Sequence, residues 1–126
     1  MEGTKVYEVY QWHLTDAEHN AINANGWEAA PKNYCDTRFG DASPEAFAES
    51  FPSYTNVANI RAKDLNEVFD IGNGYGEGPA AMPEDRISRF SKMHSVSVGD
   101  LIRDTVTGEW YAVAGYGFTE LGKDLA

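Results

Sequence analysis

The chain has 126 residues, a length that suits one domain with a conventional hydrophobic core. Twenty acidic against ten basic residues give a formal net charge of -10, which disfavours nucleic acid or a membrane as the main partner because their phosphates are repelled. Cys35 is the single cysteine, and the sequence shows neither a secretory signal nor a long apolar run, so we expect a cytoplasmic protein without disulfides.

The first elements are predicted from alternation and capping. Residues 5–13 alternate in polarity and are rich in aromatic and β-branched residues, which predicts a strand. Thr15 and Glu18 have the spacing of a capping box, so a helix should run from there to about Asn25. Gly26 should end this helix, with Trp27 packing back on its last turn.

The middle of the chain is predicted to alternate strands and short helices. We expect a short strand at 34–39, a helix that starts at Ser43-Pro44 and ends at Pro52, and another strand at 54–62. A helix should then begin after Asp64 and bury a stripe that includes Val68. Residues 72–83 are rich in Gly and Pro and read as an exposed loop, and 84–93 as a short amphipathic helix.

The C-terminal third is predicted to be a β-meander. The stretch HSVSVGDLI (94–102) reads as a strand interrupted by a turn or bulge at Gly99-Asp100. A hairpin tip at Thr107-Gly108 should lead to a return strand at 110–114, followed by a bend and, at 122–126, a frayed tail. Ser95 and Ser97 then belong to a scaffold and not to a nucleophile elbow.

These elements predict a single α+β domain over residues 1–126. Its mostly antiparallel sheet should have four to six strands, with three or four short helices packed on it and a C-terminal β-meander.

Three stretches in this order carry a family resemblance: DLNEVFDIGN (64–73), HSVSVGDLI (94–102) and YAVAGYGFTEL (111–121). Together they resemble the YodL-like domain of small proteins from phages, plasmids and conjugative elements. The stretch KVYEVYQWHLTDAEHNAINANGW (5–27) is similar to the start of small uncharacterised phage proteins. The resemblance covers about half of the chain and implies a phage or mobile-element setting, but no catalytic or binding residues.

No catalytic or metal-binding constellation emerges from the residues. His13, Asp16 and His19 are spaced H-x-x-D-x-x-H, but the first histidine should end a strand and the second lie in a helix, so we expect no metal site. Cys35 has no local signature of a nucleophile, and its approach to His94, His13 or His19 would have to come from the fold. We therefore expect neither an enzyme nor a bound cofactor.

Two groups of residues are candidates for binding a partner. Aromatic residues beside glycines in predicted turns should be exposed, and aromatic side chains dominate the cores of protein interfaces; they are Trp27, Tyr75 and Tyr116. Acidic side chains at three-residue spacing on one helix could imitate DNA phosphates; they are Asp64, Glu67 and Asp70.

The preferred hypothesis is a small acidic, non-enzymatic binding protein of phage or mobile-element origin that docks on a host or viral protein and modulates it. One alternative is a DNA-mimic inhibitor of a nucleic-acid-binding enzyme. A second is a small-ligand binder or enzyme whose site the sequence does not reveal.

Overall fold

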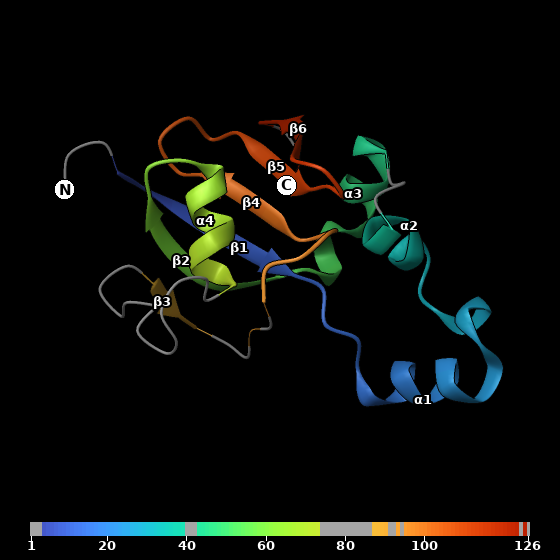
Figure 1. Cartoon of the computed structure of the whole chain (residues 1–126). Helices are drawn as coiled ribbons and strands as arrows, with labels where there is room; N and C mark the ends of the chain where they lie inside the picture. Colours follow the sequence, from blue (N-terminus) through green and yellow to red (C-terminus); the bar gives the residue numbers. More distant parts are fainter. Residues whose placement is uncertain are drawn as a thin grey trace.

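The computed structural model describes residues 4–39, 43–73, 87–90, 93, 95–123 and 125 (Figure 1). Six strands form one sheet in the order β3-β2-β1-β4-β5-β6, and all neighbours pair antiparallel. The strands are β1 (Lys5–Gln11), β2 (Thr55–Ala62), β3 (Ile87–Arg89), β4 (Leu101–Asp104), β5 (Trp110–Val113) and β6 (Phe118–Gly122).

Four α-helices and two 3-10 turns complete the described elements, which confirms the predicted α+β class of a single domain. They are α1 (Asp16–Asn25), η1 (Trp27–Ala29), α2 (Tyr34–Phe39), α3 (Pro44–Ser50), η2 (Phe51–Ser53) and α4 (Leu65–Gly72). None of the helices in the described part of the chain is both long and apolar enough to cross a bilayer.

Strand β1 lies in the middle of the sheet and its alternation divides the core between the two faces. Val9 pairs with Ala58 of β2 on one side and with Ile102 of β4 on the other. Val9 and Ile102 belong to one buried cluster, whereas Tyr10 and its partner Leu101 belong to the other. Successive residues of a strand point to opposite faces, so each face of the sheet carries its own hydrophobic cluster.

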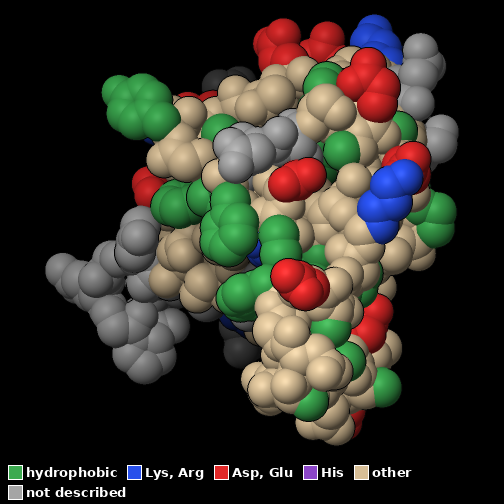
Figure 2. Space-filling model, turned by 90° about the vertical axis from the view of Figure 1, so that its right-hand side faces the viewer, with side chains coloured by type: hydrophobic (Ala, Val, Ile, Leu, Met, Phe, Trp, Pro, Cys, Tyr) green, Lys and Arg blue, Asp and Glu red, His purple; other side chains and the backbone are tan. Residues whose placement is uncertain are grey.

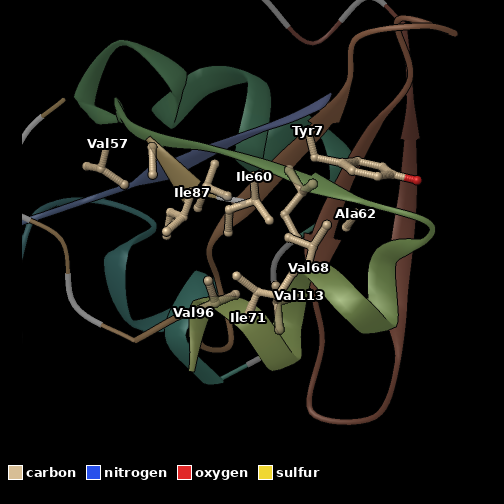
Figure 3. Packing of buried hydrophobic residues seen from close by; sticks show 12 residues of the cluster. Tyr7, Val57, Ile60, Ala62, Val68, Ile71, Ile87, Val96 and Val113 are labelled. Atoms are coloured by element: carbon tan, nitrogen blue, oxygen red, sulfur yellow. The ribbon is translucent and has the colours of Figure 1, made fainter. Parts of the chain in front are cut away.

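The first cluster is covered by α4 (Figures 1 and 3). Val68 and Ile71 of this helix lie against Ile60 of β2 and the buried Val96. Asp64 caps the helix by accepting a hydrogen bond from the backbone N–H of Glu67 at 2.9 Å, as the sequence predicts. Of the predicted stripe Leu65, Val68 and Phe69, Val68 is buried and the other two are half-buried against the same cluster, while Ile71 is buried in addition. The helix also fixes the segment around Val96 against the sheet.

The second cluster is mainly aromatic and lies on the other face. Trp110 of β5 contacts Tyr10 and Phe51 with ring centroids 4.9 and 5.1 Å apart. Phe47 of α3 is buried in the same cluster, and so is Leu125 near the end of the chain. Because the clusters share one continuous sheet, both halves of the chain contribute to a single fold.

The predicted meander β4-β5-β6 is confirmed, since these strands are consecutive both in the chain and in the sheet. At the β4–β5 turn, the Asp104 carboxylate accepts hydrogen bonds from the backbone N–H groups of Val106 and Thr107 at 2.9 and 3.1 Å. Gly108 follows with a φ of +79°, where the hairpin tip is predicted.

The segment from Leu14 to Phe39, here called the helical arm, contains α1, η1 and α2. The capping box is present: the Thr15 hydroxyl accepts from Glu18 N at 3.1 Å and Thr15 N donates to the Glu18 carboxylate at 2.8 Å. Helix α1 nevertheless buries none of its residues, and it stands away from the sheet at the lower right of Figure 1.

Residues 34–39 form the helix α2, so the predicted strand is wrong. Tyr34, Thr37 and Arg38 are three and four positions apart, and these three face the body of the protein. The Thr37 hydroxyl also donates to the Tyr34 carbonyl at 2.7 Å. A helix is the conformation that places this spacing on one side.

Two further predictions, the helix at 84–93 and the strand that starts at 94, are corrected. Residues 87–89 form β3 and not a helix, because Ile87 and Arg89 pair with Ile60 and Ala58 at the edge of β2. Residues 95–98 form no strand, because the chain turns at Val98 and Gly99 before β4 begins. The proposed loop residues 74–83, residues 84–86 and 91–92 of the predicted 84–93 helix, and positions 124 and 126 of the tail lie outside the described residues.

Candidate binding surface and polar network

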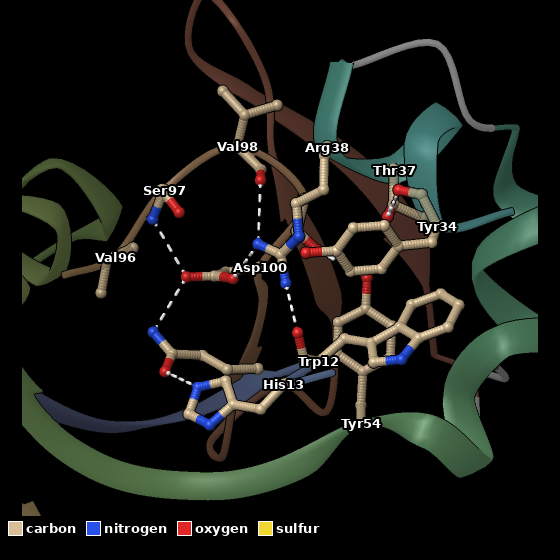
Figure 4. A network of polar contacts seen from close by, with 12 residues as sticks. Trp12, His13, Tyr34, Thr37, Arg38, Tyr54, Val96, Ser97, Val98 and Asp100 are labelled. Carbon is tan, nitrogen blue, oxygen red and sulfur yellow. Dashed lines mark hydrogen bonds and ion pairs between the residues drawn. The ribbon is translucent and has the colours of Figure 1, made fainter. Parts of the chain in front are cut away.

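A fully buried carboxylate, Asp100, organises the end of the sheet beside α2 (Figure 4). It accepts hydrogen bonds at 3.0 Å from the Gln11 side-chain amide, from the Arg38 guanidinium and from the backbone N–H of Ser97. Gln11 is also 0% exposed. A buried charge is tolerated when it is paired and hydrogen-bonded in this way. We call Gln11, Arg38, Ser97 and Asp100 the polar network.

Arg38 joins three segments through this network. Its guanidinium donates to the Trp12 carbonyl at 2.7 Å and to the Val98 carbonyl at 3.3 Å, besides the ion pair with Asp100. Its Nε is buried without a hydrogen-bond partner. Arg38 therefore ties α2 to the end of β1 and to the turn before β4.

Gly99 allows α2 to lie this close to the turn. Its φ is +92°, and a Cβ atom built there would be 2.6 Å from the Thr37 carbonyl oxygen. The buried Tyr54 hydroxyl donates to the Gly99 carbonyl at 2.6 Å. Burial raises the pKa of Tyr54 to about 12. The Gly-Asp pair predicted as a turn thus serves backbone geometry, and both Ser95 and Ser97 are exposed.

The polar network fixes the orientation of His13, which lies at its end in Figure 4. An ionised carboxylate only accepts hydrogen bonds, so the amide nitrogen of Gln11 faces Asp100 and its oxygen faces the histidine. His13 Nε2 lies 2.8 Å from that oxygen and must donate. The neutral ring of His13 therefore has its one N–H directed at Gln11.

Beside His13, a hollow of about 340 Å³ separates the start of α1 from the body of the protein. We call it the imidazole hollow. Its apolar wall is formed by Trp12, Leu14, Tyr34 and Met93, and its polar side chains are His13, Asp16 and His19. The structure therefore brings the two histidines to one hollow, although the sequence placed them on a strand and a helix that share no face. No group of three metal-binding side chains is assembled within the described ranges.

Three exposed aromatic residues mark the same end of the molecule. Trp27 is 59% exposed and Phe39 66% exposed, and their rings contact edge to face at 6.5 Å. Tyr116 is 100% exposed on the β5–β6 turn. We call Trp27, Phe39 and Tyr116 the aromatic surface. Figure 2 views this side of the molecule and shows hydrophobic side chains interspersed with acidic ones.

Hydrogen bonds connect α2 to the turn that carries Tyr116. Arg38 donates to the Val98 carbonyl, and the next residue, Gly99, donates its N–H to the Val113 carbonyl at 2.9 Å. Ala114 then donates to the Gly117 carbonyl at 3.0 Å and closes the turn. The C-terminal end of α2 and the β5–β6 turn therefore lie at one end of the sheet.

The predicted exposure of the aromatic residues is partly confirmed. Trp27 and Tyr116 are exposed as expected, while Tyr75 and His94 lie outside the described residues. Phe39 was missed because, although it precedes a glycine, it was assigned to the predicted strand 34–39 and not to a turn. Cys35 is a half-buried free thiol on α2.

The acidic row lies on α4, away from the aromatic surface (Figure 1). Asp64 and Asp70 are exposed and Glu67 is half-buried. Two of the three serve local structure, because Asp64 caps Glu67 N and the Glu67 carboxylate accepts from Lys63 N at 3.1 Å. Mimicry of DNA by this row stays a prediction.

Comparison of the chain with protein-family models, with curated proteins and with solved structures gave no match. The YodL-like resemblance therefore stays a prediction.

Proposed function

We propose that this chain is a non-catalytic domain that binds another protein through the aromatic surface. The observation that carries the proposal is the contact between Trp27 and Phe39, two large apolar rings that remain more than half exposed although they touch. Aromatic side chains of this kind supply most of the binding energy at many protein interfaces. Helix α1, which buries none of its residues, extends the available surface.

Charge around the aromatic surface favours a basic partner. The helical elements on this side carry acidic residues at several exposed positions, whereas Arg38 is already paired with Asp100 and Lys32 with Glu49. Complementary charge speeds association and selects among partners. Besides Glu49, the exposed acidic side chains are Asp16 on α1, Glu28 on η1, Asp36 on α2 and Glu45 on α3.

The biological setting is proposed from the family resemblance. In a phage or mobile element, the partner would be a host or phage protein in the host cytoplasm, and binding would modulate that protein.

Site-specific photo-cross-linking tests the proposal on the full chain. A photoreactive phenylalanine replaces Phe39 in one variant and Val106 in the other. Val106 is a matched control because it is 72% exposed on the β4–β5 turn, at the opposite end of these strands. We expect a defined cross-linked protein with the probe at 39 and none with the probe at 106.

The cross-linked protein is then purified and its Kd is measured by calorimetry. Phe39→Ser and Trp27→Ser should each weaken binding at least about tenfold, as expected for residues central to an interface. Val106→Ser should leave the Kd unchanged. Equal affinities for all three variants would refute the aromatic surface as the binding site.

A further inference from the structure

We propose that the imidazole hollow binds an organic cation, an alkylammonium or guanidinium group attached to an apolar portion. This inference goes beyond the proposed protein-binding function: it concerns the hollow, and Asp16 is the one acidic residue that the hollow shares with the surface proposed above. The size of the hollow, about 340 Å³, lies within the range of small-ligand sites. An apolar wall with a few polar groups is also the composition that such sites share.

The polar groups of the hollow favour a cation over an anion. Asp16 contributes an exposed carboxylate at the first turn of α1. In its neutral form the His13 ring directs its one N–H to Gln11, so an anion in the hollow would not gain this donor. An anion would also meet a like charge at Asp16, and of the two imidazoles only that of His19 could then offer it an N–H.

Arg38, the guanidinium beside the hollow, does not neutralise Asp16. Arg38 lies over the Tyr34 ring with its Cζ 5.3 Å from the centroid, but its charge is paired with the buried Asp100. Arg38 also donates to the carbonyls of Trp12 and Val98. The Asp16 carboxylate thus does not share its charge with Arg38 and can attract a ligand cation, in a chain whose net charge is already -10.

The aromatic wall suits the same ligand class. Trp12 and Tyr34 meet edge to face at 5.2 Å, and both line the hollow. Aromatic rings attract ammonium and guanidinium groups through their quadrupoles. The Arg38 guanidinium over the Tyr34 ring is an example of this attraction within the protein itself.

Three small probes of similar shape test the proposal on the full chain: phenethylammonium, 2-phenylethanol and 3-phenylpropionate. Binding is measured from amide chemical shifts in ¹H–¹⁵N spectra and from tryptophan fluorescence. We expect phenethylammonium to shift the amides of residues 14–19 and 34, and to bind at least about tenfold more tightly than the alcohol. Binding of 3-phenylpropionate with equal or higher affinity would overturn the proposal.

Variants distinguish the effect of the Asp16 carboxylate on binding from that of the overall negative charge of the chain. Asp16→Asn should weaken phenethylammonium binding about tenfold, and Asp16→Glu should restore most of it. Glu28→Gln is the matched control, because Glu28 is exposed in the same helical arm but does not line the hollow. It should change the affinity less than about twofold, since exposed charges at a distance are screened. Equal losses in Asp16→Asn and Glu28→Gln would overturn the proposal.

A final pair of probes identifies the source of the cation. Nα-acetyl-lysinamide and Nα-acetyl-argininamide represent basic side chains of a protein, and phenethylammonium represents a free amine. Tighter binding of an amino-acid derivative assigns the hollow to a basic side chain of a partner, and tighter binding of phenethylammonium assigns it to a small amine. If none of the three binds, the proposal is wrong.

Discussion

The sheet with α4 and the helical arm are stabilised in different ways. In the sheet, β1 pairs along both sides, and Val9, Ile60 and Ile102 are completely buried. In the arm, α1 buries nothing, and attachment depends on Tyr34, Thr37 and the ion pair of Arg38. The candidate binding features therefore lie in or beside the region that is held by the fewest buried contacts.

This contrast has a consequence for dynamics. Segments with few buried apolar contacts open locally at a lower free energy than the core of a domain. We expect amide hydrogens of α1 to exchange faster than those of β1, without global unfolding. The exchange rate of the α2 amides should depend on the polar network, because Arg38 connects this helix to two other segments.

The largest effect is expected when the polar network is broken. Asp100→Ala leaves Arg38, Gln11 and Ser97 N without their acceptor, and it should lower the free energy of unfolding by about 3–5 kcal/mol. Urea denaturation measures this loss, and hydrogen exchange should show α2 opening first. Glu49→Gln, which breaks the exposed Lys32–Glu49 pair, should have a far smaller effect, because solvent screens an exposed ion pair. Equal effects of the two variants would contradict the role assigned to Asp100.

The second prediction compares one isoleucine from each region. Ile60→Ala removes a side chain that is 0% exposed in the first cluster, and it should destabilise the protein by about 2–5 kcal/mol. Ile22→Ala in the half-exposed part of α1 should cost less than about 1 kcal/mol, because little buried area is lost. Thermal and urea unfolding of both variants provide the measurement. A cost for Ile22→Ala as large as that for Ile60→Ala would show that α1 is part of the main core.

Local signals in the sequence predicted much of this fold. The alternation of residues 5–13, the cap at Thr15 and the hairpin tip at Thr107-Gly108 each have a local physical cause, and each was found where expected. The strand at Phe118–Gly122 was not predicted. The predictions for the short elements were wrong because tertiary contacts decide the conformation of these segments. Residues 34–39 form a helix because Tyr34 and Arg38 both have partners in the body, and Ile87 joins a strand because the edge of β2 accepts it.

The candidate sites were only partly predictable. Exposure of Trp27 and Tyr116 followed from their neighbouring glycines. The polar network could not be predicted, because Gln11 and Asp100 are 89 positions apart in the sequence. Taken alone, each would be expected at the surface, since Gln and Asp are mostly exposed. The same long-range packing brings Met93 beside His13 and His19 in the imidazole hollow.

The third prediction concerns alkaline pH at the junction of the two regions. Burial raises the pKa of Tyr54 to about 12 in the folded protein, against about 10 in the unfolded chain. The unfolded state therefore loses its proton first, and stability should fall by roughly 2–3 kcal/mol between about pH 10 and pH 12. Tyr54→Phe should remove this part of the pH dependence, at the cost of the hydrogen bond to Gly99.

Urea midpoints between pH 8 and pH 12 test the alkaline prediction, with Tyr116→Phe as a control at a fully exposed ring. The control should follow the wild-type curve. An unchanged slope in Tyr54→Phe would mean that the buried phenol does not couple folding to pH.

The smallest effect is expected at the far end of the sheet, where Asp104 makes an ion pair with Lys5 at 2.6 Å. Burial alone would raise the pKa of Asp104, but Lys5 and the backbone N–H groups of Thr107 and Val106 outweigh it and hold the pKa below its usual value. The carboxylate therefore stabilises the fold above the unfolded pKa of about 4, and this contribution is lost as the pH falls through the lower folded value. Asp104→Asn should cost about 1–2 kcal/mol at pH 7.

Urea unfolding of Asp104→Asn and the wild type at pH 7, 5 and 3 measures how this cost changes with protonation. The difference should shrink at pH 3, because the wild-type carboxylate then begins to take up a proton and loses its charge-dependent contacts. Lys5→Gln distinguishes the contribution of the ion pair from that of the turn, because it leaves the hydrogen bonds from Val106 and Thr107 to Asp104 in place. It should therefore lower the free energy of unfolding less than Asp104→Asn does. A difference between Asp104→Asn and the wild type that stayed constant with pH would mean that Asp104 acts through its shape and not through its charge.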